Sequence, residues 1–290
     1  MASWTVLAHN QGLFLIAILI LGLVMGSFLN VVVFRLPKML EIRWRHDCLE
    51  LLGRLPEPES GRFDLIYPPS TCPNCGQRIA PWHNIPIVSY LWLRGRSACC
   101  HSPISLRYPV IEGLTGILSL AVAWRFGFSL QTLAALVFTW NLIALSFIDL
   151  DHQLLPDAIT LPMVWLGLLL SLTGAFTDPQ ASILGATFGY LSLWSVYQCF
   201  KLFTGKEGMG YGDFKLLAAA GAWLGWQALP SIILLSSLAG AVIGLGLTLI
   251  SGRDKNIPLP FGPYLALAAW IALMWGGDLN QLYLQLSGIP

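Results

Sequence analysis

Long apolar runs without charged residues dominate the chain and predict membrane-spanning helices. A helix needs about 20 apolar residues to cross the hydrocarbon of a bilayer. Six charge-free stretches reach about this length, at 12–34, 126–148, 158–177, 179–200, 216–252 and 256–277. The stretch 216–252 is too long for one pass at about 1.5 Å per residue, and 226–230 offers a turn, so we expect two helices there. A weaker span at 109–124 brings the expected total to about eight helices.

The distribution of Lys and Arg predicts on which side of the membrane each loop lies, because basic loops stay cytoplasmic. If both termini are periplasmic, fifteen of the sixteen Lys and Arg residues fall in inner segments and only Arg125 lies outside. The first apolar segment lacks a basic region before it and exceeds the usual signal-peptide core of about 7 to 15 residues. We therefore interpret it as a retained helix and not as a cleaved signal peptide.

The segment between the first two spans differs from the rest in composition and predicts a cytoplasmic insert at 36–108. Together with Arg35 directly before it, it contains ten Lys and Arg residues, and it contains nine prolines. Its first part, 41–53, has apolar positions at the spacing of a short amphipathic helix. Its second part, 70–108, is too small and too rich in loops to bury much core, so it needs a further stabilising element such as a disulfide or a bound metal. We expect three parts: a first transmembrane helix at 1–35, this insert, and a seven-helix membrane domain at 109–290.

Composition supports the membrane interpretation and excludes one class of partner. The chain is 56% hydrophobic and 11% charged, whereas soluble domains are about one quarter charged. The formal net charge of +1, without a basic helix or tail, argues against a nucleic-acid partner. The predicted fold class is an all-α polytopic membrane protein in a lipid bilayer.

Two cysteines in the second part of the insert form a turn typical of metal sites. Cys72-Pro-Asn-Cys75 is followed by Gly76, which is the pattern of one half of a zinc knuckle. The predicted topology places this turn in the reducing cytoplasm, where stable disulfides are rare, so a metal is favoured over a disulfide. A redox C-x-x-C is disfavoured because that motif belongs to a βαβ setting.

The second half of the metal site is irregular. Cys99, Cys100 and His101 do not form a second C-x-x-C, because Ser97 stands where the first cysteine of that motif would be. Four N or S ligands are the norm for structural zinc. The alternative is a reduced, metal-free module in which the thiols only pack. We expect a structural Zn²⁺ ion, held by Cys72, Cys75, Cys100 and either Cys99 or His101.

Acidic residues at the predicted membrane boundary are candidates for catalysis, because ionisable groups there are costly. Asp149 closes an apolar run, and Asp213 is framed by glycines at 208, 210 and 212. Two neighbouring carboxylates that share a proton can act as base and acid, and such a pair activates water against a peptide carbonyl without a metal. We therefore expect Asp149 and Asp213 to be catalytic, whereas Asp151 and Asp157 are expected to cap helices or face solvent.

The glycines around Asp213 let the backbone bend and let a substrate strand approach closely. A phosphate-binding loop is disfavoured, because G-x-x-x-x-G-K-[ST] is absent and no strand precedes the glycines.

Motifs over nearly the whole chain resemble the type IV prepilin peptidase family, in which G-x-G-D marks an intramembrane aspartyl protease. The matching segments are Gly210-Tyr211-Gly212-Asp213, Gly26-Ser27-Phe28-Leu29-Asn30-Val31, Asn84-Ile85-Pro86, Ser89-Tyr90-Leu91, Arg107-Tyr108-Pro109 with Glu112, Asp149 to Asp157, and Pro260-Phe261-Gly262-Pro263.

The resemblance implies a bifunctional enzyme of type IV pilus or type II secretion systems in the bacterial inner membrane. Such enzymes cut the basic leader from prepilins and pseudopilins after a glycine at the cytoplasmic face. They then N-methylate the new terminal residue, with S-adenosyl-L-methionine as the methyl donor.

The resemblance also assigns residues. The catalytic aspartates of the family fall at Asp149 and Asp213, and its four cysteines fall at positions 72, 75, 97 and 100, so Ser97 departs from the pattern. Gly95-Arg96 matches a glycine-basic pair associated with methylation, although a plain turn would have the same sequence.

Two other classes of protein remain alternatives. A proton-coupled transporter also carries membrane acids, but its acids lie at the midplane, whereas these cluster at one face. A non-catalytic assembly protein of a secretion machine could dock through the cysteine module, but that role leaves the two aspartates unexplained.

Overall fold

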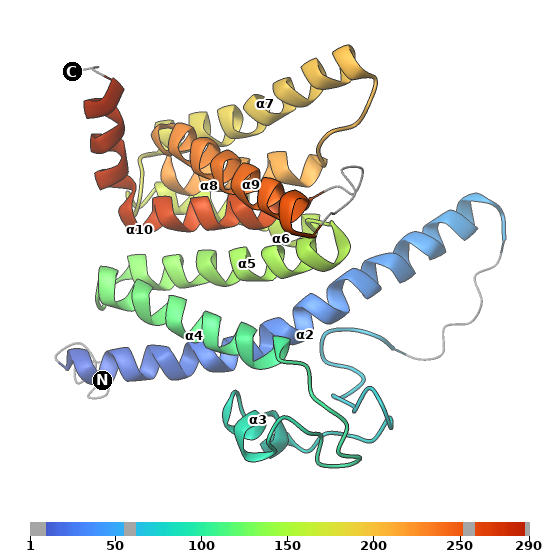
Figure 1. The fold of residues 1–290 in the computed structure, drawn as a ribbon. Helices are drawn as coiled ribbons and strands as arrows, with labels where there is room; N and C mark the ends of the chain where they lie inside the picture. The colour runs from blue at the N-terminus through green and yellow to red at the C-terminus, as the bar shows by residue number, and fades with distance from the viewer. Residues whose placement is uncertain (1–9, 55–61, 252–258, 288–290) are drawn as a thin grey trace. The chain divides into compact units, whose positions relative to one another are not determined.

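The computed structural model describes residues 10–54, 62–251 and 259–287, and it confirms the all-helical prediction for these residues (Figure 1). The only extended pairings among them are two isolated bridges, Thr71 with Arg78 and Arg96 with Pro103. The helices are α2 (Gln11–Leu51), η1 (Pro81–Asn84), α3 (Val88–Trp92), α4 (Arg107–Phe126), α5 (Leu130–His152), α6 (Asp157–Ser171), α7 (Pro179–Thr204), α8 (Tyr211–Leu224), η2 (Trp226–Ala228), α9 (Leu229–Ser251) and α10 (Gly262–Ser287).

Each of the eight expected apolar segments contributes its own α-helix to the described residues, in α2 and in α4 to α10. The expected break in 216–252 occurs at Gly225, whose φ of +83° ends α8 before the turn η2. By length and composition, four helical segments of the described residues could cross a membrane: α2, α4, α5 and 226–246. The total of about eight spans stays a prediction, and the start of the last one, 256–258, lies outside the described residues together with Arg253 and Lys255.

The first helix is longer than the sequence pattern predicts. A separate amphipathic helix at 41–53 was expected, but α2 runs without interruption to Leu51. Pro37 lies inside this helix. A proline removes one backbone hydrogen bond, and here the helix continues past it.

The chain divides into two compact units, residues 1–128 and 129–290. The first contains α2, the insert and α4, and the second contains α5 to α10. This grouping differs from the three parts expected above because α4 packs against α2. The three-part division concerns sidedness in the membrane and stays a prediction.

Small residues allow α2 and α4 to pack closely in the first unit. A Cβ atom on Gly26 would lie 2.6 Å from the Cα atom of Glu112, and one on Gly22 would lie 2.7 Å from Ser119 Oγ. Asn30 Nδ2 joins the same helices by donating to the Tyr108 carbonyl at 3.2 Å. Apolar burial contributes little between helices in lipid, so close packing and polar contacts hold such pairs together.

Glycines also set the packing of α7 on α8 in the second unit. A Cβ atom on Gly185 would collide with the Gly221 carbonyl, and one on Gly221 would collide with the Gly185 carbonyl. Ser182 Oγ donates to the Ala222 carbonyl at 2.6 Å, and Trp223 Nε1 donates to the Met163 carbonyl of α6 at 2.8 Å. These contacts fix α8, which carries Asp213, between two neighbours.

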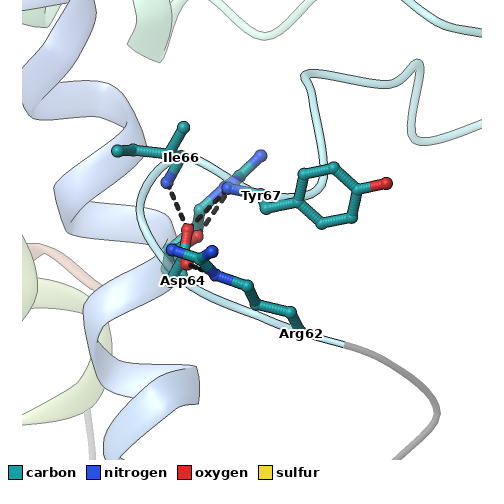
Figure 2. Close-up of polar contacts among 5 residues, drawn as sticks. Arg62, Asp64, Ile66 and Tyr67 are labelled. Atoms are coloured by element: carbon teal, nitrogen blue, oxygen red, sulfur yellow. Dashed lines mark hydrogen bonds and ion pairs between the residues drawn. The ribbon is translucent and has the colours of Figure 1, made fainter.

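The insert is tied to α2 through a buried arginine. Arg35 donates to the carbonyls of Asp64 at 2.9 Å and Pro68 at 2.6 Å. The Asp64 carboxylate in turn accepts from the amides of Ile66 and Tyr67 and pairs with Arg62 (Figure 2). The two amides and the guanidinium hold the pKa of Asp64 below its ordinary value. The loop is therefore ordered around its own carboxylate and fastened to α2 by Arg35.

Candidate active site and cysteine cluster

Asp149 lies at the end of α5, buried with 6% of its surface exposed. The helix stops just beyond it, because Gln153 adopts a left-handed conformation and donates its amide to the Asp149 carbonyl. The side chain is held from another part of the chain: Asp149 Oδ2 accepts from the Gly262 amide at 2.9 Å. This carboxylate is thus oriented by a fixed backbone donor.

Asp213 lies in the first turn of α8 and is 7% exposed. Gly210 is the N-cap of this helix, and the Asp213 amide donates to its carbonyl at 3.2 Å. Asp213 is therefore a buried side chain at the start of α8.

The fold brings the two aspartates together, as the sequence predicts. They are close enough for the charge of Asp149 to act on Asp213. Leu155 packs between the segments that carry them: a Cβ on Gly212 would lie 2.7 Å from Leu155 Cβ, and a Cβ on Gly262 would lie 3.2 Å from Leu155 Cδ2. The connection after α5, the start of α8 and the start of α10 therefore converge on one pair of buried carboxylates.

The other two aspartates lie outside this pair. Asp151 is exposed. Asp157 begins α6, has a side chain that is 55% exposed, and forms an ion pair with Lys215 Nζ at 2.6 Å. Both positions agree with the capping and solvent-facing roles expected for them.

The sequence did not assign a role to Gly262. In the sequence, Gly262 is marked only as part of the matching segment Pro260-Phe261-Gly262-Pro263. In the structure its amide donates to Asp149, and a Cβ atom on it would lie 2.7 Å from Asp149 Oδ2. A glycine between two prolines directly before an apolar run was the signal that could have marked it.

Four thiols gather in the insert. The Sγ atoms of Cys72, Cys75, Cys99 and Cys100 all lie within 4.8 Å of one another. The shortest separation is 3.2 Å, between Cys75 and Cys99, and Cys72 lies 3.7 Å from Cys100. The cluster includes Cys99 and not His101, so the structure favours the first of the two alternatives for the fourth ligand.

The backbone explains why His101 stays outside the cluster. In the first turn, Cys72 donates to the Gln77 carbonyl and Gly76 donates to the Cys72 carbonyl. In the second turn, the Ser97 amide donates to the Ser102 carbonyl and the His101 amide donates to the Ser97 carbonyl, which is the same pattern. His101 therefore takes the place of Gly76, and both have positive φ, +56° and +71°.

Ser97 correspondingly takes the place of Cys72. Its Oγ lies 3.2 Å from Cys100 Sγ and 3.5 Å from Cys99 Sγ. The second half was expected to be irregular, and that interpretation was wrong for the backbone. The second turn is a knuckle with serine at its first ligand position and Cys99 beside it.

Two of the thiols have surroundings that favour the thiolate, which is the form that binds metals. The backbone amides of Cys75 and Asn74 lower the pKa of Cys72 to about 7. The hydroxyls of Ser102 and Ser97 lower the pKa of Cys100 to about 5. Four S ligands at this separation suit a tetrahedral Zn²⁺ site.

The first unit also encloses a cavity of about 490 Å³ between α2, α4 and the insert. Gly95 and Arg96 do not line it. Gly95 has a φ of +71°, and a Cβ on it would lie 2.9 Å from the hydroxyl of Tyr90, which does line the cavity. Gly95 therefore makes room for Tyr90, and Arg96 forms the bridge with Pro103.

Apolar helices around a buried carboxylate pair, with a separate cysteine module, define the class of membrane-embedded aspartyl peptidases. The chain belongs to the type IV leader peptidase family: residues 136–245 match that family, and residues 20–126 match the bacterial peptidase A24 N-terminal domain.

Its relatives include proteins named prepilin leader peptidase/N-methyltransferase from three genera. The protein of Pseudomonas aeruginosa is 54% identical over 97% of both chains. The protein of Aeromonas hydrophila is 52% identical over 98% of this chain and 99% of its own length. The protein of Legionella pneumophila is 45% identical over 91% of this chain and 92% of its own length. No solved structure gives a significant match.

Proposed function

We propose that this protein removes the basic leader from prepilins and pseudopilins and then N-methylates the new terminal residue. The observation that carries the peptidase half is the buried pair of Asp149 and Asp213. The names of the relatives support both halves. The names of the relatives give no support to a proton-coupled transporter, and a purely structural role leaves the two buried carboxylates without a purpose.

The surroundings of the pair suggest a division of roles. The Gly262 amide can only donate, so it stabilises the ionised form of Asp149. Asp149 is therefore the base that takes a proton from the attacking water. Asp213 keeps the shared proton and gives it to the developing oxyanion of the scissile carbonyl.

The protein is proposed to lie in the bacterial inner membrane with both termini periplasmic and the aspartates at the cytoplasmic side. The terminal residues 1–9 and 288–290 lie outside the described residues, so sidedness rests on the distribution of Lys and Arg. A prepilin with its apolar helix in the bilayer and its basic leader in the cytoplasm would present the scissile bond at this boundary.

The direct test is cleavage of a purified prepilin in lipid vesicles. Mass spectrometry should show a product that begins directly after the glycine of the leader. With S-adenosyl-L-methionine present, the product should be about 14 Da heavier, which is the mass of one added methylene. An intact prepilin after prolonged incubation with folded protein would contradict the peptidase function.

The cysteine cluster is proposed to hold one structural Zn²⁺ ion through Cys72, Cys75, Cys99 and Cys100. A loop-rich module of this size has little core, so a metal would supply much of its stability. We propose no step of the peptide cleavage at this site.

Elemental analysis should find about one zinc ion per chain, and Cys75→Ser or Cys99→Ser should lower that content towards zero. The double variant Ser97→Cys/Cys99→Ser should regain zinc, because Ser97 already has the backbone position of Cys72. Cys48→Ser and Cys199→Ser are matched controls, since both thiols are exposed and outside the cluster. Full zinc content in Cys99→Ser alone would exclude Cys99 as the fourth ligand.

Methyl transfer is proposed to take place in the first unit. S-adenosyl-L-methionine would supply an electrophilic methyl group there. The cavity of about 490 Å³ has the size of a small-molecule site. Its wall offers phenol rings at Tyr90 and Tyr108 and polar side chains at Asn30 and Asn84, which suit an adenosine and an amino-acid moiety.

A further inference from the structure

One carboxylate faces the cavity between α2, α4 and the insert. Among the described residues, Glu112 is the only acidic side chain that lines it. Glu112 is 8% exposed and lies in the second turn of α4. A carboxylate in such a place is costly and needs a reason.

Two groups hold the Glu112 side chain, one from the insert and one from α2. The Ile87 amide of the insert donates to Glu112 Oε2 at 2.8 Å, and Ser27 of α2 hydrogen-bonds to the same carboxylate. Ile87 has a φ of +57°, which is strained for a β-branched residue. An ionised carboxylate can accept about four hydrogen bonds, so these two partners leave capacity for a ligand.

Methyl transfer to an amino terminus needs a proton acceptor. An α-amino group has a pKa of about 7.7 to 8.0, so most of it is an ammonium without a lone pair at neutral pH. We propose that the new amino terminus of the cleaved substrate enters this cavity and that Glu112 is the catalytic base that accepts its proton. This inference rests on the proposed methyl transfer.

The step balances in atoms and charge. The ammonium gives one proton to the Glu112 carboxylate, and the freed lone pair of the nitrogen attacks the methyl carbon. The bond from that carbon to the sulfonium sulfur breaks, its electron pair stays on sulfur, and S-adenosylhomocysteine is the leaving group.

Other titratable groups face the same cavity. The basic ones are Arg35, Arg78 and His83. Arg35 is occupied by the carbonyls of Asp64 and Pro68. The remaining groups are the thiols of Cys72 and Cys99 and the phenols of Tyr90 and Tyr108, and both thiols belong to the proposed zinc site. Among these groups, His83 is therefore the rival candidate for the base that accepts the proton.

Glu112→Gln separates a chemical role from a structural one. Its amide oxygen can still accept from Ile87, so the contact between α4 and the insert is kept, but it cannot take a proton. Methylation of pre-cleaved pilin should fall by roughly 10²- to 10⁴-fold, the usual contribution of a general base. The residual rate should rise about tenfold per pH unit up to the pKa of the amine, because only the free amine reacts.

Five further measurements complete the test. Leader cleavage and zinc content should match the wild type. Calorimetric binding of S-adenosylhomocysteine should be unchanged, whereas binding of the mature pilin amino-terminal peptide to that complex should weaken by about tenfold, because a charge-assisted hydrogen bond is lost. His83→Gln should leave methylation and its pH profile unchanged.

The outcomes are distinguishable. Wild-type methylation in Glu112→Gln overturns the inference, and so does loss of cleavage, zinc and binding together, which would make Glu112 structural. Loss of methylation in His83→Gln, with activity kept in Glu112→Gln, moves the base to His83. If the wild-type protein cleaves but does not methylate, the proposed methyl transfer itself fails.

Discussion

Asp213→Asn is expected to abolish leader cleavage, and Asp149→Asn is expected to do the same. Asparagine keeps the shape of the side chain and its hydrogen bonding, but it cannot exchange a proton. Each member of the pair has a separate proton to move, and one general acid or base contributes about 10²- to 10⁴-fold. In the vesicle assay both variants should therefore fall to background, with membrane insertion and melting temperature unchanged.

Asp151→Asn and Asp157→Asn are the matched controls and should retain cleavage. Asp151 is exposed, and Asp157 forms an exposed ion pair with Lys215, which is worth about 1 kcal/mol or less. Cleavage at the wild-type rate by Asp213→Asn would refute the mechanism. Full loss in Asp151→Asn, with activity kept in Asp149→Asn, would move the pair by two residues.

The second large effect is expected at the contact between α7 and α8. Gly221→Ala should destabilise the second unit, because the added Cβ collides with the Gly185 carbonyl and backbone cannot move aside as a side chain can. Overpacking of this kind costs about 1–3 kcal/mol. We expect a melting temperature lower by several degrees in detergent, and a loss of cleavage in proportion to the unfolded fraction.

Gly246→Ala is the matched control for this prediction. Gly246 lies in α9, and a Cβ there would meet nothing within 4 Å. Alanine in an open helical position is favoured over glycine by about 0.5–1 kcal/mol, so this variant should be as stable as the wild type or more stable. Equal melting temperatures for Gly221→Ala and the wild type would contradict this prediction, because they would show that α7 and α8 can move apart without a loss of stability.

The helices and the positions of the two aspartates at helix ends were predictable because their causes are local. Charge-free runs of the right length mark helices, and the end of such a run at Asp149 and the glycines before Asp213 mark a boundary. That the two carboxylates interact depends on helix packing, which periodicity does not encode. The resemblance to a family implies that pairing.

Features that depend on backbone conformation were harder to predict. Nothing in the residue type of Gly262 shows that its amide points to Asp149, because every non-proline residue has such a donor. The second knuckle was hidden by Ser97 and by His101, a histidine in a position that favours glycine. The offset of 25 residues between Cys75 and Cys100, and between Ile79 and Ile104, was the signal that could have revealed it.

The amide that orients Asp149 belongs to a residue 113 positions later in the chain. During biosynthesis, a ribosome completes Asp149 and Asp213 well before it reaches Gly262 at the start of α10. A nascent chain that already holds both aspartates thus still lacks the backbone donor that orients the Asp149 side chain. The arrangement of the buried carboxylate pair is consequently complete only when the last helix has packed into the second unit.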